Sequence, residues 1–324
     1  MPYPSNGNCR FDQVFLESIR RARNLRKLAV LVGAPITFRL ETRSGRRAFE
    51  VECVTGHARL GCTGAGGDPA APTGLANCER GLAFDIGANT GQDTVALLAR
   101  GLRVVAVEAN PKLCADMRKR FAAEIGAGRL VIIDRAISGR KTVTLYVNTA
   151  DSGWGTTMPD YAARGMALAG DLEEIEVETI TVPEIIRAHG VPDYLKVDIE
   201  GADILCLLGL FDVDGAPRFI SIERPSSIPK QRFAFELLRR LGYTRFQIID
   251  QTKVPEQRHR TLAFQRGDTG LFGSELPKAD WMGFSRSWLL NCWIVFRSGI
   301  MRRIPGIRRF AVKGRWFDIH ASIQ

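Results

Sequence analysis

Between residues 80 and 250, short apolar runs alternate with segments whose apolar residues recur every three or four positions. The short runs are rich in Val, Ile and Phe, as buried strands are, and the periodic segments have the spacing of amphipathic helices. This alternation predicts an α/β fold in which helices cover both faces of a mostly parallel sheet. The expected strands are 81–87, 103–110, 129–138, 141–148, 174–182, 193–201, 218–225 and 245–251, of which we expect the last to be the final strand of the domain. The expected helices are 90–101, 111–125, 183–190, 202–210 and 230–243.

Two regions that flank this alternation differ from it in composition. Residues 13–32 have helical periodicity, residues 36–54 resemble a hairpin, and a Gly-, Ala- and Pro-rich stretch follows. We therefore divide the chain into an N-terminal helix, hairpin and linker (1–76), a central domain (77–252) and a C-terminal extension that we expect to cover a substrate (253–324).

The composition is that of an ordinary globular protein. Of the 324 residues, 45% are hydrophobic and 25% are charged. The N-terminus lacks the pattern of a signal peptide, and the longest apolar run, 288–296, is shorter than the roughly 20 residues of a membrane-spanning helix. We therefore expect a cytoplasmic protein. The seven cysteines are scattered without a Cys-x-x-Cys pair, so neither a disulfide framework nor a zinc ribbon is predicted.

The net charge of +10 comes largely from two basic segments near the ends, 20–27 and 302–315. The second follows the Trp-rich run 288–296, and basic residues beside apolar ones are typical of segments that contact anionic membrane surfaces. No RNA-binding signature or zinc-finger spacing accompanies the charge, so we expect no nucleic-acid partner. Peripheral membrane contact through the basic ends stays open beside a simple solvated surface.

The segment "FDIGANTG", residues 84–91, ends a strand and opens a helix. Gly87 can form the sharp turn after the strand, and Gly91 can let a ligand approach the helix N-terminus. The dinucleotide-binding pattern G-x-G-x-x-G would need glycine at Asn89. Asp85 would repel a pyrophosphate but attract the positive groups of S-adenosylmethionine. The motif therefore favours that cofactor over a nicotinamide dinucleotide.

Acidic residues also end the next two expected strands. Glu108 stands where a carboxylate can accept both ribose hydroxyls, which occurs with either cofactor. Asp134 ends the third strand and can accept from an adenine amino group. Because parallel strands present their carboxyl ends to one crevice, these acids indicate an adenosine-bearing ligand.

The chain resembles the FkbM-type methyltransferases. The resemblance spans roughly 80 to 250 and rests on "FDIGANTGQDT", "VVAVEANP", "DRAIS", "SGWGTT", "DYLKVDIEGADILCLLG" and "FISIERP". It implies a Rossmann-like, seven-stranded methyltransferase sheet with N- and C-terminal extensions. It also implies S-adenosylmethionine-dependent methylation of an oxygen in a sugar, glycolipid or natural product. One departure is Pro183, which stands where the family commonly has an acid, and we expect it to cost a helix cap.

The resemblance also assigns roles to individual residues. It implies that Asp85, Gly87, Asn89 and Gly91 line the methionine part, that Glu108 binds the ribose, and that Asp134 and Ala136 bind the adenine edge. Asp198 and Glu200 would lie beside the reactive methyl group.

Catalysis on a hydroxyl is helped by a nearby base. The candidates are Asp198, Glu200 and Glu223 at the same sheet edge, and His320 in the C-terminal extension. Magnesium held by the carboxylates is conceivable, but the spacing does not support it, and we assign no metal ligand. The acceptor is expected to be a small molecule or glycan.

Three classes of function stay open at this point. The first is an O-methyltransferase, the second a nicotinamide-dependent oxidoreductase, and the third a non-catalytic membrane-surface protein with a degenerate methyltransferase fold. The sequence does not indicate the acceptor or the oligomeric state.

Overall fold

The computed structural model describes residues 81–148, 155–159, 162, 172–297 and 315–323. The N-terminal helix, hairpin and linker expected within 1–76 lie outside the described residues. The described strands are β1 Leu82–Ile86, β2 Arg103–Glu108, β3 Leu130–Asp134, β4 Ala136–Ile137, β5 Thr142–Asn148, β6 Gly155–Thr156, β7 Leu172–Ile180, β8 Tyr194–Val197, β9 Phe219–Glu223, β10 Arg245–Asp250 and β11 Phe317–Ser322. The α-helices are α3 Gln92–Ala99, α4 Pro111–Arg120, α5 Ala122–Gly126, α7 Val182–His189, α8 Asp203–Gly209, α9 Ile228–Arg240 and α10 Phe284–Val295. Short 3₁₀ turns are η1 Leu210–Asp212, η2 Gln251–Glu256, η3 Gly273–Glu275 and η4 Lys278–Asp280.

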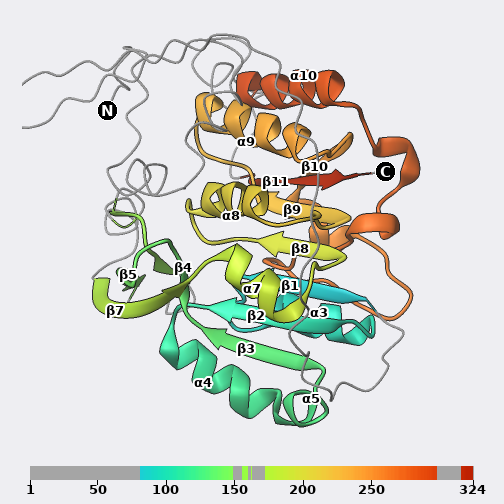
Figure 1. Cartoon of the computed structure of the whole chain (residues 1–324). Helices are drawn as coiled ribbons and strands as arrows, with labels where there is room; N and C mark the ends of the chain where they lie inside the picture. The colour runs from blue at the N-terminus through green and yellow to red at the C-terminus, as the bar shows by residue number, and fades with distance from the viewer. Residues whose placement is uncertain (1–80, 149–154, 160–161, 163–171, 298–314, 324) are drawn as a thin grey trace, which may run out of the picture. The chain divides into compact units, whose positions relative to one another are not determined.

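A seven-stranded sheet has the order β10-β11-β9-β8-β1-β2-β3, which confirms the Rossmann-like fold (Figure 1). Strands β3, β2, β1, β8 and β9 pair in parallel, so their carboxyl ends share one edge. Both faces of this sheet are buried: Phe84, Leu195 and Ile222 lie on one face, and the polar residues Asp85, Lys196 and Ser221 lie on the other. Phe84 in β1, Leu195 in β8 and Ile222 in β9 are each 0% exposed. Such strands need helices on both sides, which explains the alternation in the sequence.

The seventh strand corrects the expected domain boundary. β11 lies between β9 and β10 and is antiparallel to both. The segment 317–322 therefore completes the sheet, although the sequence-based division places it in an extension beyond residue 252. Strand 245–251 is also not the final one. Local sequence patterns indicate neighbouring elements, but they do not reveal that β11, about seventy residues after β10, returns to pair with β9 and β10.

A second sheet of four strands has the order β4-β7-β5-β6. Both of its long strands, β5 and β7, are predicted from the sequence. They pair with each other along Thr142 to Asn148 of β5. This sheet matters for function because β4, β5 and β6 carry residues that face a pocket.

Local capping explains where two helices begin. Asn110 accepts from the Lys112 backbone N–H at 3.0 Å ahead of Pro111, which needs no donor in the first turn. Thr181 and Glu184 form a reciprocal capping box at the start of α7. Pro183 therefore costs this helix no cap, and that expectation is wrong.

Candidate functional site

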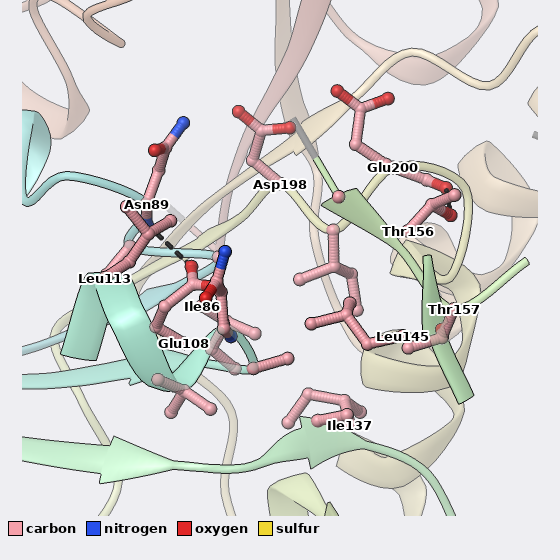
Figure 2. Close-up of a pocket in the computed structure, with 18 of the residues that line it drawn as sticks. Ile86, Asn89, Glu108, Leu113, Ile137, Leu145, Thr156, Thr157, Asp198 and Glu200 are labelled. Atoms are coloured by element: carbon pink, nitrogen blue, oxygen red, sulfur yellow. Dashed lines mark hydrogen bonds between the residues drawn. The ribbon is translucent and has the colours of Figure 1, made fainter. Parts of the chain in front are cut away.

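A pocket that is partly open to solvent lies at the carboxyl edge of the parallel strands. The loops after β1, β2 and β8 form one side, and β4, β5 and β6 of the second sheet contribute another. Figure 2 shows the polar side chains of Asn89, Asp198 and Glu200 toward one end, and Ile137 and Leu145 toward the other. The pocket can therefore hold a ligand with one polar end and one flat apolar end.

Gly87 allows the loop after β1 to lie close to the loop after β8. It has φ 84°, and a Cβ there would lie 1.8 Å from the Asp198 carbonyl oxygen. The Gly87 and Ala88 N–H groups both donate to the Val107 carbonyl, at 2.9 and 3.0 Å. This tight turn places the backbone of Gly87 in the pocket wall, as the sequence predicts.

Glu108 lies in the pocket wall at the end of β2. Its two carboxylate oxygens accept from the backbone N–H groups of Asn89 and Asn110, each at 2.8 Å. Burial raises the pKa of Glu108, and these hydrogen bonds act against that rise. Each oxygen keeps capacity for another hydrogen bond, so the carboxylate is positioned to accept two ligand hydroxyls.

Asn89 gives the pocket a polar atom that lacks a hydrogen-bond partner. Its backbone has φ 52°, unusual for a residue with a side chain. Its Oδ1 atom is buried and has no hydrogen-bond partner within the described part of the chain. An unpaired buried acceptor is costly, and here it faces a pocket, so a ligand donor would satisfy it.

Lys196 is a buried cation in the floor of the pocket. Its Nζ atom lies 3.0 Å from Asp93 Oδ2, 3.4 Å from Asp85 Oδ1 and 3.8 Å from Asp198 Oδ2. Burial by itself lowers the pKa of Lys196, but these carboxylates raise it well above its ordinary value. The ammonium therefore stays charged and links the pocket to the interior of the domain.

Asp85 corrects one of the predicted contacts. Its side chain is 0% exposed and does not line the pocket. It accepts from Thr94 Oγ1 at 2.7 Å and pairs with Lys196. Burial raises its pKa, and Lys196 acts in the opposite direction. Asp85 therefore lies behind Lys196 and not in the pocket lining, where the sequence-based prediction of a contact with the methionine part of a cofactor would place it.

Two further predicted cofactor residues lie away from the pocket. Gly91, with φ 79°, packs so closely that a Cβ would lie 2.6 Å from the Phe121 ring, which makes it a packing glycine. Asp134 pairs with Arg118 at 3.2 Å and does not line the pocket. Ala136, its expected companion, does line it.

Asp198 and Glu200 both line the pocket, as predicted. The Asp198 side chain is 48% exposed, so its carboxylate can meet a molecule that enters from solvent. Glu200 has φ 50°, and its carbonyl accepts from Thr156 Oγ1 at 3.0 Å. The Asp203 carboxylate holds this loop by accepting from the N–H groups of Ile199 and Gly201, at 3.5 and 3.2 Å. The Asp203 carboxylate therefore fixes the backbone of the loop that carries Asp198 and Glu200 before α8.

The other two catalytic candidates are not placed at the pocket. Glu223 ends β9 outside its lining, and burial, followed by the charges of Asp198 and Asp203, raises its pKa to about 10. It is protonated at neutral pH and is therefore not a base. His320 is 1% exposed within β11, opposite Ser221 and Gln247. Burial lowers its pKa to about 4, and the structure contradicts the expectation that it reaches the site from a covering extension.

Sequence reasoning missed several pocket residues. Lys196 had a signal, because a lysine two positions before Asp198 in an apolar strand lies on the same side of it. Ile137, Leu145 and Thr156 had none, because their convergence depends on the second sheet, and Leu113 reaches the pocket from α4. Gly267 joins the lining from the C-terminal region.

Within the described ranges, no group of His, Cys, Asp and Glu side chains is arranged to hold a metal ion. The helices of the same ranges include none long and apolar enough to cross a membrane.

Comparison with known proteins identifies the family. Residues 85–245, about half of the chain, match the methyltransferase FkbM domain. No curated protein matches the chain in sequence. Similar solved structures include precorrin-6y C5,15-methyltransferase from Geobacter metallireducens, with 12% identity, a TM-score of 0.33, and coverage of 75% of this chain and 80% of that chain. Others are a human methyltransferase 10 domain containing protein (7% identity, TM-score 0.34, coverage 78% and 76%) and a SAM-dependent O-methyltransferase from Thermotoga maritima (10% identity, TM-score 0.32, coverage 75% and 58%).

These structural likenesses are too low to carry an argument about function. The family match contains β2, β3, β8 and β9 of the seven-stranded sheet, the end of β1, and most of the residues that line the pocket. The chain therefore belongs to the FkbM methyltransferase family, which implies S-adenosylmethionine as its methyl donor.

Proposed function

We propose that the protein methylates a hydroxyl oxygen of a small-molecule or glycan acceptor, such as a sugar, glycolipid or natural product. The observation that carries this proposal is the position of Asp198. Its half-exposed carboxylate lies in the lining of the pocket, 3.8 Å from the buried Lys196 ammonium. A neutral hydroxyl is a weak nucleophile and gains from a base that takes its proton, whereas a neutral amine can attack before it loses a proton.

The pocket residues fit S-adenosylmethionine in chemistry. Glu108 would accept from the ribose hydroxyls, and the unpaired Asn89 Oδ1 would accept from a donor on the ligand. Leu113, Ile137 and Leu145 offer apolar surface to the adenine. When bound, this donor supplies a methyl group made electrophilic by its positively charged sulfur.

Asp198 and Glu200 would act on the acceptor. We infer that Asp198 takes the proton of the acceptor hydroxyl as its oxygen attacks, and that Glu200 orients the acceptor. Lys196 holds Asp198 through its charge. Alignment of the two reactants in the pocket can contribute roughly 7 to 11 kcal/mol to catalysis.

The test is transfer of a labelled methyl group to a panel of acceptors that carry hydroxyl, amine or activated carbon groups. Label in a methyl ether supports the proposal, and label on nitrogen or carbon overturns it. Asp198→Asn should lower kcat by roughly 10²- to 10⁴-fold while S-adenosylhomocysteine affinity changes little. Wild-type protein that binds NADH but not S-adenosylhomocysteine would instead favour the oxidoreductase alternative.

A further inference from the structure

Helix α10 buries two polar residues and exposes two large apolar ones. Ser287 and Asn291 are both 0% exposed, whereas Leu289 is 70% exposed and Trp293 is 52% exposed. An ordinary surface helix shows the reverse distribution. The outward residues of α10 therefore need an explanation beyond the fold of the domain.

Specific contacts hold the inner face of α10 against the domain. Asn291 Nδ2 donates to Gln231 Oε1 at 2.8 Å, and Ser287 Oγ donates to the Gly283 carbonyl at 3.0 Å. Trp288 packs edge-on against Phe235 of α9, with ring centroids 5.8 Å apart. These contacts set the rotation of the helix, because turning Leu289 inward would move the buried asparagine to the surface and break its pair with Gln231.

The outer face forms one continuous apolar stripe. Leu289 and Trp293 are four residues apart, so they lie one turn apart on the same side of α10. Trp293 stacks on Phe296, with ring centroids 5.6 Å apart and an interplanar angle of 22°. Figure 1 shows α10 beside α9, at the end of the seven-stranded sheet that carries β10. We call Leu289, Trp293 and Phe296 the outer stripe.

The charged residues in the sequence around the outer stripe are all basic. Residues 281–315 contain eight Lys or Arg residues and no Asp or Glu. Arg286, on α10, is exposed, and among the described basic residues Arg315 pairs with Asp250 at 2.9 Å. In a symmetric dimer through the stripe, the exposed Arg286 would approach its own copy, and this like-charge contact disfavours the dimer. Nucleic acid matches the charge but offers no apolar medium for Leu289.

We infer that the outer stripe of α10 docks on an anionic lipid bilayer surface. Leu289 and the Trp293 indole enter the boundary between headgroups and acyl chains, and the exposed Arg286 of the same helix faces the phosphates. The net positive charge of the sequence 281–315 is complementary to the same anionic surface. The contact is peripheral. Membrane docking is independent of the identity of the methyl acceptor, and it would bring the enzyme to lipid-linked acceptors.

The experiment is flotation of the full chain with phosphatidylcholine vesicles and with vesicles in which one third of the lipid is phosphatidylglycerol. We expect binding to the anionic vesicles, weakened severalfold by added salt, and little binding to the neutral ones. The double variant Leu289→Ser/Trp293→Ser should lower anionic-vesicle affinity by at least about tenfold. Its S-adenosylhomocysteine affinity and thermal stability should stay near wild type, because both side chains are exposed.

The matched control is Val131→Ser/Val191→Ser, which removes two other exposed apolar residues, 40% and 39% exposed, that lie outside α10. This control should bind vesicles as wild type does. The proposal is overturned if wild type does not float with anionic vesicles, or if the two double variants lose binding equally. It is also overturned if wild type is a dimer that Leu289→Ser/Trp293→Ser converts to a monomer without an effect on vesicles. Methyl transfer is a separate readout, so loss of the proposed reaction leaves this test intact.

Discussion

Asp93 accepts two hydrogen bonds from Thr269, one from the backbone N–H and one from the hydroxyl, each at 2.8 Å. The same carboxylate lies 3.0 Å from Lys196 Nζ. Asp93 therefore ties the C-terminal region, including the pocket residue Gly267, to the charged floor of the pocket. This buried link explains how a segment distant in sequence becomes part of the site.

Thr269→Val should weaken this link while the backbone hydrogen bond remains. We expect a loss of about 1–3 kcal/mol in the free energy of unfolding, because a buried carboxylate loses one donor. Affinity for S-adenosylhomocysteine, measured by calorimetry, should fall as well, because the segment around Gly267 is released. The control is Thr252→Val, whose hydroxyl donates to Asp250 away from the pocket. Equal loss of affinity in both variants would contradict the role of the link.

Glu108→Gln tests the proposed ribose contact. The amide keeps the size of the side chain but replaces one acceptor oxygen by a donor, so affinity for S-adenosylmethionine should fall by about 1.5–3 kcal/mol, roughly 10- to 150-fold. Asp134→Asn is the matched control, because Asp134 pairs with Glu108 in the register of β2 and β3 but faces Arg118. Its affinity should equal that of wild type. A larger effect of Asp134→Asn than of Glu108→Gln would restore the adenine contact expected from the sequence.

Lys196→Met should be one of the most destabilising single substitutions in the domain. It leaves the buried carboxylates of Asp85 and Asp93 without their shared cation, and the expected loss is about 3–5 kcal/mol in chemical denaturation. Lys112→Met removes an ion pair with Glu173 in which the side chains are 69% and 48% exposed, and it should cost less than about 1 kcal/mol. Similar midpoints for the two variants would show that the Lys196 network is not a structural centre.

The raised pKa of Glu223 leads us to predict that the stability of the fold decreases as the pH rises. Its pKa is about 10 in the folded protein, above the ordinary value of 4.5, so from about pH 4.5 to 10 the folded state binds a proton that the unfolded state lacks. The free energy of unfolding therefore decreases with pH across this window. Glu223→Gln should make the thermal midpoint less dependent on pH between about 5 and 9. Glu236→Gln is the control of opposite sign, because the Arg239 and Arg240 contacts lower the Glu236 pKa to about 2 and confine its effect to more acidic pH. An unchanged slope in Glu223→Gln would contradict the assignment.

The sequence by itself determined the elements of the parallel sheet and part of the pocket. Apolar periodicity located β1, β2, β3, β8 and β9, because buried strands and amphipathic helices leave local patterns. Gly87, Asn89, Glu108 and Asp198 line the pocket as predicted, because strand order alone brings the carboxyl ends of neighbouring parallel strands to one edge.

Only the tertiary structure decided which acids face the ligand and which face the interior. Asp85 turns toward Lys196 and Thr94, Asp134 turns toward Arg118, and His320 lies inside the sheet. It also decided that β11 inserts between β9 and β10, and that α10 buries Asn291 while it exposes Leu289. The physical reason is that periodicity records the side of an element on which a residue lies. The direction of a polar side chain depends on partners that are far away in the sequence and are brought close only by folding.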